Sequence, residues 1–410
     1  MSSEWTFAPL ESCLEALIDY RGKTPEKTDS GIPLITAKII KRGRIEKATE
    51  FIAEDNYASW MRRGIPKEGD IVLTVEAPLG EVAQLGSEKI ALAQRVVTLR
   101  GKEGVLDNTY LLYLLQTEEM LEQLKARATG TTVLGIKQSE LRKVPLSLPP
   151  IAQQRSAASI LKTLDDRLTL LRETNATLET IAQALFKSWF VDFDPVRAKA
   201  EGFEPEGMDA ATAALFPDSF EESELGLVPS GWKVGKVEDL MELPYGKALK
   251  ATDRVDGQVP VYGSGGITGC HNESLVNGPS VIVGRKGTVG SLYWEDRPFF
   301  PIDTVFYVRT DNPLTYCYYL LQTLGLENMN TDGAVPGLNR NNAYRLPVVV
   351  ATTSILESFD EIVSSLRNKM FSNSQHTQTL TQLRDTLLPR LISGQLRLPE
   401  AEVMVEEICA

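Results

Sequence analysis

Basic side chains set among glycines are the residues of this sequence whose types and spacing suggest a specific chemistry, and that chemistry is binding. Arginine and lysine neutralise phosphates or bind guanine edges with two hydrogen bonds, and asparagine can bind adenine in the same way. The candidate DNA-binding residues of the first half are Arg21, Lys23, Thr24, Lys38, Lys41, Arg42, Arg44, Arg62 and Arg63. Those of the second half are Lys247, Lys250, Arg254, Arg285, Lys286, Asn339, Arg340 and Asn341. Such clusters are also common on solvated surfaces, so their recurrence in both halves supports the set and not any single residue.

The sequence contains no convincing motif for catalysis. The segment Gly263-Ser-Gly-Gly-Ile-Thr268 has threonine where a dinucleotide-binding loop needs its third glycine, and Gly284–Gly290 lacks the Gly-Lys-Ser/Thr ending of a P-loop. The four cysteines are scattered and there are only two histidines, which argues against a disulfide framework and against a zinc site. We therefore expect a chain with no catalytic residues and no bound metal.

The net charge of −12 does not exclude a nucleic-acid partner, because the excess of acids is confined to two segments. Residues 192–224 contain ten acids and two bases, and residues 400–410 contain four acids and no base. The remainder of the chain is neutral overall, so local basic surfaces decide what it binds. The sequence has neither an apolar run of about 18 residues nor a signal-peptide pattern, and we expect a cytoplasmic protein.

The same order of short motifs occurs twice, about 200 residues apart. The offset between the copies is 227 residues at the first motif, 206 at the second and 202 at the end of the third. Copy one therefore has extra residues near its start, and a duplicated unit of this kind suits a ligand with two parts. The matched segments are Trp5–Glu11 with Trp232–Glu238, Tyr110–Thr117 with Tyr316–Thr323, and Gly130–Pro145 with Gly333–Pro347.

Each copy alternates short β-like runs with glycine-rich turns and ends in a helix, which predicts a compact α+β domain. The β-like runs of the first copy are Ile32–Thr36, Asp70–Val75 and Arg95–Leu99, and a helix is expected around 108–127. Those of the second copy are Pro260–Tyr262, Ser280–Val283, Ser291–Trp294 and Thr304–Val308, and a helix is expected around 313–325.

A long heptad-patterned helix is predicted after each domain, over about 152–190 and 353–392. Each would be about 60 Å long and too polar to be stable alone, so we expect the two to pack as an antiparallel coiled coil. Lys369 and His376 interrupt the second pattern, while Phe359, Ile362 and Leu366 keep its frame. Asn175 and Asn373 occupy core positions near the two midpoints, and we hypothesise that they meet and fix the register. The alternative is that each is solvated or bonds to its own helix.

Several of these segments resemble the specificity subunit of a type I restriction–modification enzyme, and the resemblance covers nearly the whole chain. Ser188–Gly202 is similar to the end of that family's first helical region, and Leu387–Gly394 is similar to its second. The entry to the second target-recognition domain and a pattern within it are matched by Leu215–Phe220, Glu224–Trp232, Val281–Ser291 and Pro301–Thr304.

The resemblance implies a chain that recognises a bipartite, asymmetric site in double-stranded DNA with two target-recognition domains in a pseudo-two-fold repeat. It implies two modification subunits and further restriction subunits as partners, which would bring S-adenosylmethionine, ATP and Mg, so that adenine methylation and restriction are not performed by this chain. The implied divisions are 1–150 and 231–350 for the recognition domains, 151–191 and 351–395 for the helical regions, 192–230 for an acidic linker and 396–410 for an acidic tail.

Two other interpretations stay open from the sequence. One is a fused modification–specificity enzyme, which the missing methyltransferase motifs oppose, and the other is an acidic DNA mimic or scaffold. The linker is either a strap that docks a partner or a solvated spacer. We expect the acidic tail to be disordered.

Overall fold

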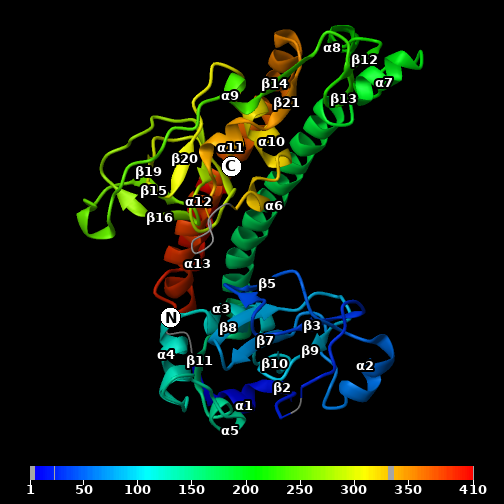
Figure 1. Cartoon of the computed structure of the whole chain (residues 1–410). Coiled ribbons are helices and arrows are strands. Elements are labelled where there is room, and N and C mark those ends of the chain that lie inside the picture. The colour runs from blue at the N-terminus through cyan, green and yellow to red at the C-terminus, as the bar shows by residue number, and fades with distance from the viewer. Residues whose placement is uncertain (1–4, 23, 331–336, 410) are drawn as a thin grey trace. The chain divides into compact units, whose positions relative to one another are not determined.

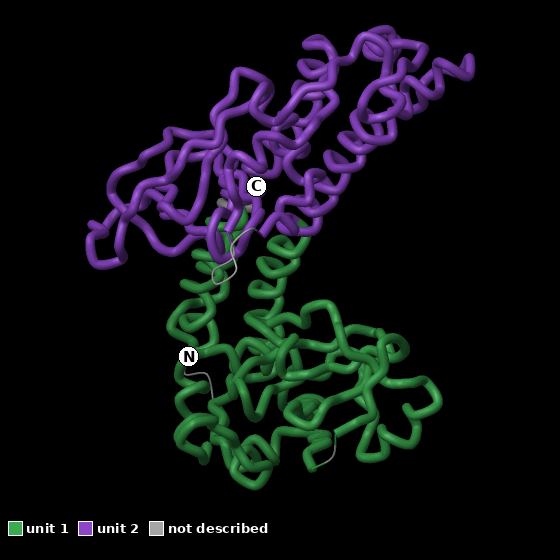
Figure 2. The backbone as a smooth tube through the Cα atoms, viewed as in Figure 1, with its two compact units in different colours: residues 1–170, 376–410 green, residues 171–375 purple. Residues whose placement is uncertain are grey.

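The structure is a computed structural model that describes residues 5–22, 24–330 and 337–409 of the chain. The chain forms two compact units, residues 1–170 with 376–410 and residues 171–375 (Figure 2). Each unit joins one mixed domain to one half of two 40-residue helices, α6 (Ile151–Phe190) and α12 (Thr353–Ile392) (Figure 1). No helix among the described residues is long and apolar enough to cross a membrane.

The first unit is built around a four-stranded antiparallel sheet in the order β2-β10-β7-β8. All five residues of β7 are buried, because the strand lies between two neighbours in the sheet and is packed by α3. At its start Asp70 accepts two hydrogen bonds of 2.7 Å from Arg100 of β10, which satisfies a buried carboxylate. The sheet strands are β2 (Leu14–Asp19), β7 (Ile71–Val75), β8 (Leu79–Gln84) and β10 (Val96–Gly101), and α3 is Asn108–Leu115.

Smaller elements complete this unit. The antiparallel pair β1 and β11 joins the start of the domain to the residues just before α6. The other strands are β3 (Ile32–Ile35), β4 (Ile40–Lys41), β5 (Arg44–Ile45), β6 (Phe51–Ile52) and β9 (Ala91–Leu92), with β1 at Thr6–Pro9 and β11 at Pro145–Leu148. The short helices are α1 (Leu10–Cys13), α2 (Glu54–Trp60), α4 (Glu118–Ala126) and α5 (Gln138–Leu141).

The single helix expected around 108–127 is instead two helices, α3 and α4. Thr117 separates them in an extended conformation, and its hydroxyl accepts a hydrogen bond from the backbone N–H of Met120 at 3.3 Å. A threonine in this position caps the second helix and ends the first, a local competition that apolar periodicity does not reveal.

The second unit contains two three-stranded sheets, in the orders β16-β15-β19 and β18-β17-β20, and the pair β14-β21. The expected helix around 313–325 is confirmed as α10 (Leu314–Thr323). The strands are β14 (Lys233–Lys236), β15 (Val259–Gly263), β16 (Gly266–His271), β17 (Ser280–Gly284), β18 (Leu292–Glu295), β19 (Phe300–Pro301), β20 (Val305–Tyr307) and β21 (Pro347–Val350). The remaining helices are α9 (Val237–Leu240), η1 (Ala251–Asp253), η2 (Leu326–Asn328) and α11 (Arg340–Tyr344).

The sequence repeat corresponds to a repeat of strand register. In the first unit Thr6 of β1 pairs with Leu148 of β11, and in the second Lys233 of β14 pairs with Val350 of β21. These partners are separated by the offsets of 227 and 202 that the motifs predict. The parallel pairs β3-β9 and β15-β19 also recur, so the two domains share one plan. Residues 333–336 of the third repeated motif lie outside the described residues.

The hypothesis that Asn175 and Asn373 meet is confirmed within the second unit. The Asn373 amide donates to the Asn175 side-chain oxygen at 2.8 Å, and the Asn175 amide donates to the backbone carbonyl of Met370 at 3.0 Å. The α12 helix is continuous through both expected interruptions, with Lys369 exposed and His376 half-buried. The prediction that Ile362 occupies a core position of the heptad pattern is wrong. This side chain is 40% exposed, and Val363 is fully buried in its place.

One ion pair in each unit links α6 with α12, and a tyrosine from the neighbouring domain joins it. In the first unit Asp165 of α6 contacts Arg384 of α12 at 2.9 Å and accepts a hydrogen bond of 2.9 Å from Tyr113. In the second unit the carboxylate again lies on α6 and the cation on α12. There Glu179 of α6 contacts Arg367 of α12 at 3.3 Å and accepts from Tyr319 at 3.2 Å. Both tyrosines belong to the repeated helix, α3 or α10.

The acidic segment 192–230 is not a solvated spacer. It folds into α7 (Asp194–Ala200), α8 (Ala210–Leu215) and a hairpin of β12 (Phe220–Ser223) and β13 (Gly226–Pro229). Phe216 is 2% exposed and meets Trp189 of α6 edge-on, with ring centroids 5.0 Å apart. Buried apolar residues among the acids pack this segment against the rest of the second unit. The net charge of the segment does not reveal these residues.

The expectation of a disordered acidic tail is also wrong, because residues Leu398–Cys409 form helix α13. Ala401 is fully buried and Val405 is 9% exposed, so side chains four residues apart make a buried stripe on this helix. The high acid content of the tail predicts disorder, but this short apolar pattern is enough to pack the helix.

The asparagine pair generates a prediction about stability. Asn373→Leu should cost about 1–3 kcal/mol of unfolding free energy, because it leaves the partly buried amide oxygen of Asn175 without its donor. Replacing both asparagines with leucine should recover or exceed the wild-type stability while loosening the register of the helices. Urea denaturation measures the first effect and disulfide trapping between α6 and α12 measures the second. A double variant less stable than Asn373→Leu would contradict this account of the pair.

The packing of the acidic segment generates a second prediction. Phe216→Ala should lower the unfolding free energy by about 3–5 kcal/mol, as expected for removing a buried aromatic ring. The neighbouring Leu215 is 38% exposed and serves as the matched control, with Leu215→Ala costing much less. Thermal and chemical denaturation of the two variants compare them directly, and equal small losses would show that the segment does not depend on this contact.

Candidate nucleic-acid interface

In the second unit, two arginines lie against one exposed tyrosine. The guanidinium carbon of Arg285 is 4.9 Å from the ring centroid of Tyr245, and that of Arg340 is 4.7 Å from the same centroid. Tyr245 is 46% exposed, so the group is open to a ligand. We call Tyr245, Arg285 and Arg340 the Tyr245 cluster.

Three separate parts of the chain position the Tyr245 cluster. The Tyr245 ring packs on Phe306 of β20 with centroids 5.0 Å apart. Arg285 directly follows β17, and its side chain donates to the backbone carbonyl of Asp303 at 2.8 Å. Arg340 begins α11, where Asn339 caps the helix by accepting a hydrogen bond from the Asn341 backbone at 2.9 Å.

The cluster carries positive charge that no carboxylate neutralises within the described part of the chain. Neither Arg285 nor Arg340 forms an ion pair there, and the buried Nε of Arg340 has no hydrogen-bond partner in that part. Lys286 and Lys247 are exposed on the neighbouring turns. Unpaired arginine and lysine donors on turns are suited to phosphates and to the acceptor edge of guanine.

The other candidates of the second unit divide into exposed and internally bonded side chains. Lys250 and Asn341 are exposed. The guanidinium of Arg254 donates to the backbone carbonyl and the hydroxyl of Thr268, at 2.6 and 3.2 Å, and so ties η1 to β16. Asn339 uses its side-chain oxygen as the cap of α11. The structure therefore gives Arg254 and Asn339 positioning roles in this unit.

In the first unit, the basic run at 41–44 forms the tip of the β4-β5 hairpin. Arg42 and Gly43 have φ values of +48° and +83°, the left-handed conformation that a tight two-residue turn requires. Glycine adopts this conformation readily, but an arginine in it is strained. Lys41 pairs with Glu46 at 2.8 Å, and the Arg42 backbone N–H donates to Glu81 at 2.7 Å. A groove of about 470 Å³ lined partly by Arg42, Gly80 and Glu81 opens beside the tip.

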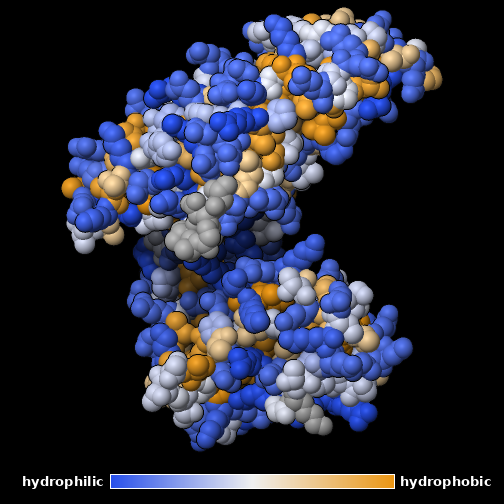
Figure 3. Space-filling model, viewed as in Figure 1, coloured by the Kyte–Doolittle hydropathy of each residue, from blue (hydrophilic) through white to orange (hydrophobic). Residues whose placement is uncertain are grey.

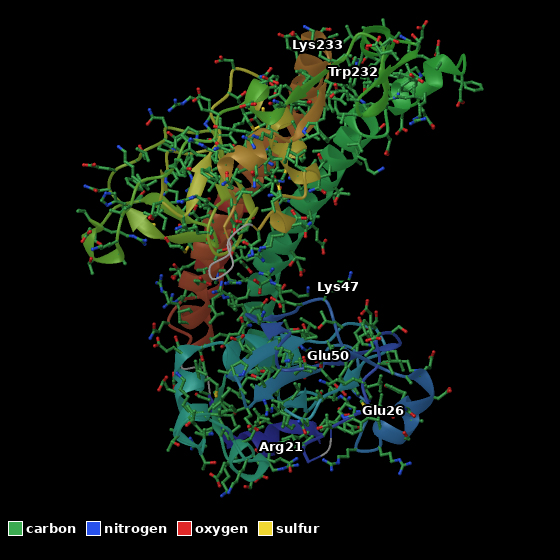
Figure 4. The ribbon with its side chains drawn as sticks, viewed as in Figure 1. Arg21, Glu26, Lys47, Glu50, Trp232 and Lys233 are labelled. Carbon is green, nitrogen blue, oxygen red and sulfur yellow. The ribbon has the colours of Figure 1, made fainter. Side chains whose placement is uncertain are left out.

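The remaining candidates of the first unit do not join that hairpin. Arg21 binds Asp19 at 2.6 Å and the backbone carbonyl of Ile136 at 2.7 Å, and Arg63 donates to the carbonyls of Asp19 and Arg21. Figure 4 shows Arg21 at the edge of this unit opposite Lys47, which lies just beyond the hairpin. Lys38, Arg62 and Thr24 are exposed, Arg44 is half-buried, and Lys23 lies outside the described residues.

Tyr245 is a component that the sequence analysis missed. It is a lone tyrosine between Pro244 and Gly246, with no periodic pattern to mark it. The signal that could have found it is its position two residues before Lys247 in a turn-rich stretch. Among the described residues, no group of histidine, cysteine and carboxylate side chains is arranged to hold a metal ion. The Nδ1 atom of His271 accepts the backbone N–H of Val255 at 3.1 Å.

In the second domain of the repeat, arginines without a carboxylate partner among the described residues lie against an exposed aromatic ring, an arrangement suited to a binding protein. The family model for the type I restriction modification DNA specificity domain matches residues 3–180 and 229–343, more than half of the chain. The chain therefore belongs to this family of type I restriction-modification specificity proteins.

Relatives and a solved structure agree with this assignment. The chain is 26% identical to the type I restriction enzyme MjaIX specificity subunit of Methanocaldococcus jannaschii, over 92% of this chain and 90% of that protein. It is 27% identical to the HindI specificity subunit of Haemophilus influenzae, over 75% and 82% of the two chains. The S subunit of a type I restriction-modification system from M. genitalium has the same fold, with a TM-score of 0.62 and 21% identity over 95% of this chain and 96% of that one.

The left-handed conformation of Arg42 generates a prediction. Arg42→Gly should raise the unfolding free energy by up to about 1 kcal/mol, because glycine adopts this φ without strain. Lys41→Gly is the matched control: it replaces a strand residue of the same hairpin and should lower stability instead. Urea denaturation of both variants measures the difference. A loss of stability in Arg42→Gly would mean that the arginine side chain stabilises the hairpin by more than the strain costs.

Proposed function

We propose that this chain is the DNA-specificity subunit of a type I restriction-modification complex and recognises a bipartite, asymmetric site in double-stranded DNA. The observation that supports this most directly is the Tyr245 cluster, whose two arginines, one on a turn and one at the start of α11, form no ion pair among the described residues. The cluster lies in a family-matched domain that occurs twice. Each domain would bind one half of the site, with exposed cations contacting phosphates and base edges.

The asymmetry of the site is proposed from the differences between the two domains. The domains share strand registers and connecting helices but present different side chains on their turns, with Tyr245 between two arginines in the second and the Arg42 hairpin in the first. Identical domains would favour a palindromic site, as symmetric dimers do. Two domains with different side chains in one chain favour two different half-sites.

The gap between the half-sites is proposed to depend on α6 and α12. Each helix has 40 residues, which corresponds to about 60 Å at about 1.5 Å per residue. Dimeric DNA-binding proteins space their half-sites by the geometry of the element that joins their domains, and these helices join the two units here. Inserting or removing helical turns should therefore change the unspecified gap and leave the half-sites as they are.

Partner subunits are proposed to carry the chemistry. Two modification subunits would supply S-adenosylmethionine and the catalytic residues for adenine methylation, and restriction subunits would supply ATP, Mg and DNA cleavage. A base inside a duplex must be flipped out before it is methylated, so the specificity subunit has to hold the DNA while a partner extracts the adenine. This division is consistent with a chain whose sequence contains no recognisable catalytic motif. The interpretation as an acidic DNA mimic is not supported, since the excess of acids over bases lies outside both domains and the family match covers most of each.

One surface is available for such a partner beside the acidic segment. A groove of about 640 Å³ is lined by Ile181 and Leu185 of α6, Ile362 of α12 and Met208 of the acidic segment. Apolar side chains also gather on the exposed face of the second unit (Figure 3). A surface of this kind is suited to a protein partner, and we propose that a modification subunit covers it.

The decisive experiment is genome-wide mapping of N6-methyladenine in the source cell, with and without this gene. Removing the gene should abolish methylation at one motif made of two short blocks around a fixed gap, and every other methylated motif should persist. Returning the gene on a plasmid is the control and should restore the motif. If no bipartite motif depends on the gene, while the modification subunit is expressed and co-purifies with this chain, the proposal is wrong.

A further inference from the structure

The turn that carries Arg285 and Lys286 has a structural copy in the first unit. Strands β7 and β8 pair Ile71 with Gln84, and β17 and β18 pair Val281 with Trp294. Both partners are shifted by 210 residues between the units, so the turn at 75–80 corresponds residue by residue to the turn at 285–290. We call these the first and second tip loops.

Backbone hydrogen bonds confirm the correspondence. The N–H of Val75 donates to Arg95 at 3.0 Å, as the N–H of Arg285 donates to Thr304 at 2.9 Å. The carbonyls of the same two residues accept from Ile136 and Leu338, at 3.0 and 2.8 Å.

The two loops also share a left-handed position and a bridge to a later segment. Ala77 and Gly287 occupy the same position and both have a left-handed φ, +49° and +86°. Glu76 and Lys286 each form a bridge with the segment that leads to the next short helix, at Gly135 and Gly337. The two loops therefore share strand register and backbone contacts but carry different side chains, and the Ala77–Pro78 peptide bond of the first loop is cis whereas residues 285–290 contain no cis bond.

Two of those side chains at matching positions, Lys286 and Glu76, have opposite hydrogen-bonding chemistry. The second tip loop carries Arg285 and Lys286, and Arg340 begins the neighbouring helix α11. At the same positions the first unit has Val75, Glu76 and Gln138, the last being the first residue of α5. Cations can only donate, whereas an ionised glutamate can only accept. At this one position a ligand therefore meets a donor in the second loop and an acceptor in the first.

The surroundings of Glu76 suggest a binding role for its carboxylate. It is half-buried beside Gly135, and it forms no ion pair within the described residues, where eighteen other pairs are formed. A negative charge near DNA phosphates weakens binding in general. The compensating interaction available in the major groove is with an exposed amino group, and carboxylates accept from the N4 amino group of cytosine.

We propose that Glu76 is a specificity-determining residue that accepts a hydrogen bond from the N4 amino group of a cytosine in the first half-site. Lys286 occupies the same position in the second domain and binds the O6 and N7 acceptors of a guanine in the second half-site. This inference rests on the proposed function and deepens it, because it assigns one base of each half-site to one side chain. The first half-site must then contain a C·G pair under the first tip loop.

The test uses the assembled methyltransferase complex with Glu76→Gln, Glu76→Ala or Lys286→Ala in this chain. Both Glu76 variants should relax the methylated motif at one C·G position of the first half-site, with discrimination falling on the order of ten-fold, and leave the second half-site unchanged. Lys286→Ala should do the reverse. Glu103→Gln, at an exposed carboxylate in the turn after β10, is the matched control and should leave both half-sites unchanged.

Comparing how tightly the wild-type and variant complexes bind a modified and an unmodified duplex separates base recognition from a general loss of activity. The wild-type complex should bind a duplex with N4-methylcytosine at that position on the order of ten-fold more weakly than the unmodified duplex. The Glu76→Ala complex should bind the two duplexes equally.

Several outcomes would overturn the inference. These are an equal penalty for N4-methylcytosine in both complexes, an unchanged motif in both Glu76 variants, or a first half-site without a C·G pair. A wild-type complex without any bipartite motif would instead contradict the proposed function itself.

Discussion

The pairing of α6 with α12 is the constraint on which the rest of the structure depends. Each helix is amphipathic and polar over 40 residues, and neither buries enough apolar surface alone to be stable. Each domain is attached to this pair through the repeated helix, where Tyr113 or Tyr319 donates to a carboxylate that is already ion-paired between α6 and α12. The same side chains therefore fix the register of the two helices and the position of each domain against the helices of its own unit. The Asn175–Asn373 hydrogen bond favours the same register in the second unit.

The distribution of charge in the two ion pairs restricts how the helices can associate. Asp165 and Glu179 both lie on α6, and Arg384 and Arg367 both lie on α12. Two copies of α6 placed antiparallel would bring carboxylates together at these positions, and two copies of α12 would bring arginines together. Like charges at partly buried positions are unfavourable, so the pattern favours α6 with α12 over either helix with itself. A duplicated chain needs such a distinction, because its halves are otherwise alike enough to mispair.

The duplication also explains how one scaffold can serve two different ligands. The strands, their registers and the backbone hydrogen bonds of the tip loops are repeated, while the side chains at the tips are not. Val75 and Glu76 in one loop stand where Arg285 and Lys286 stand in the other. Because the backbone contacts of each loop are made by N–H and carbonyl groups, its exposed side chains can change without altering the fold. Binding preference can thus diverge while stability is retained.

The sequence by itself determined the duplication and the two long helices, because these follow from local periodicity and from motifs repeated at fixed offsets. It placed the two asparagines at core positions of the helices but left open whether they contact each other. It did not determine the break at Thr117, the order of the acidic segment or the helix at the C-terminal end. In those places a few apolar or capping side chains outweigh the average composition. The sequence also could not distinguish basic residues whose side chains bind groups within the protein from those that form no ion pair in the described part of the chain.

Only the tertiary structure decided that Arg21 binds a carbonyl 115 residues away, at Ile136, while Arg285 and Arg340 converge on Tyr245 from distant turns. The physical reason is that a cation's availability depends on which acceptors the fold brings within about 3 Å of it. Local sequence contains no record of those distances.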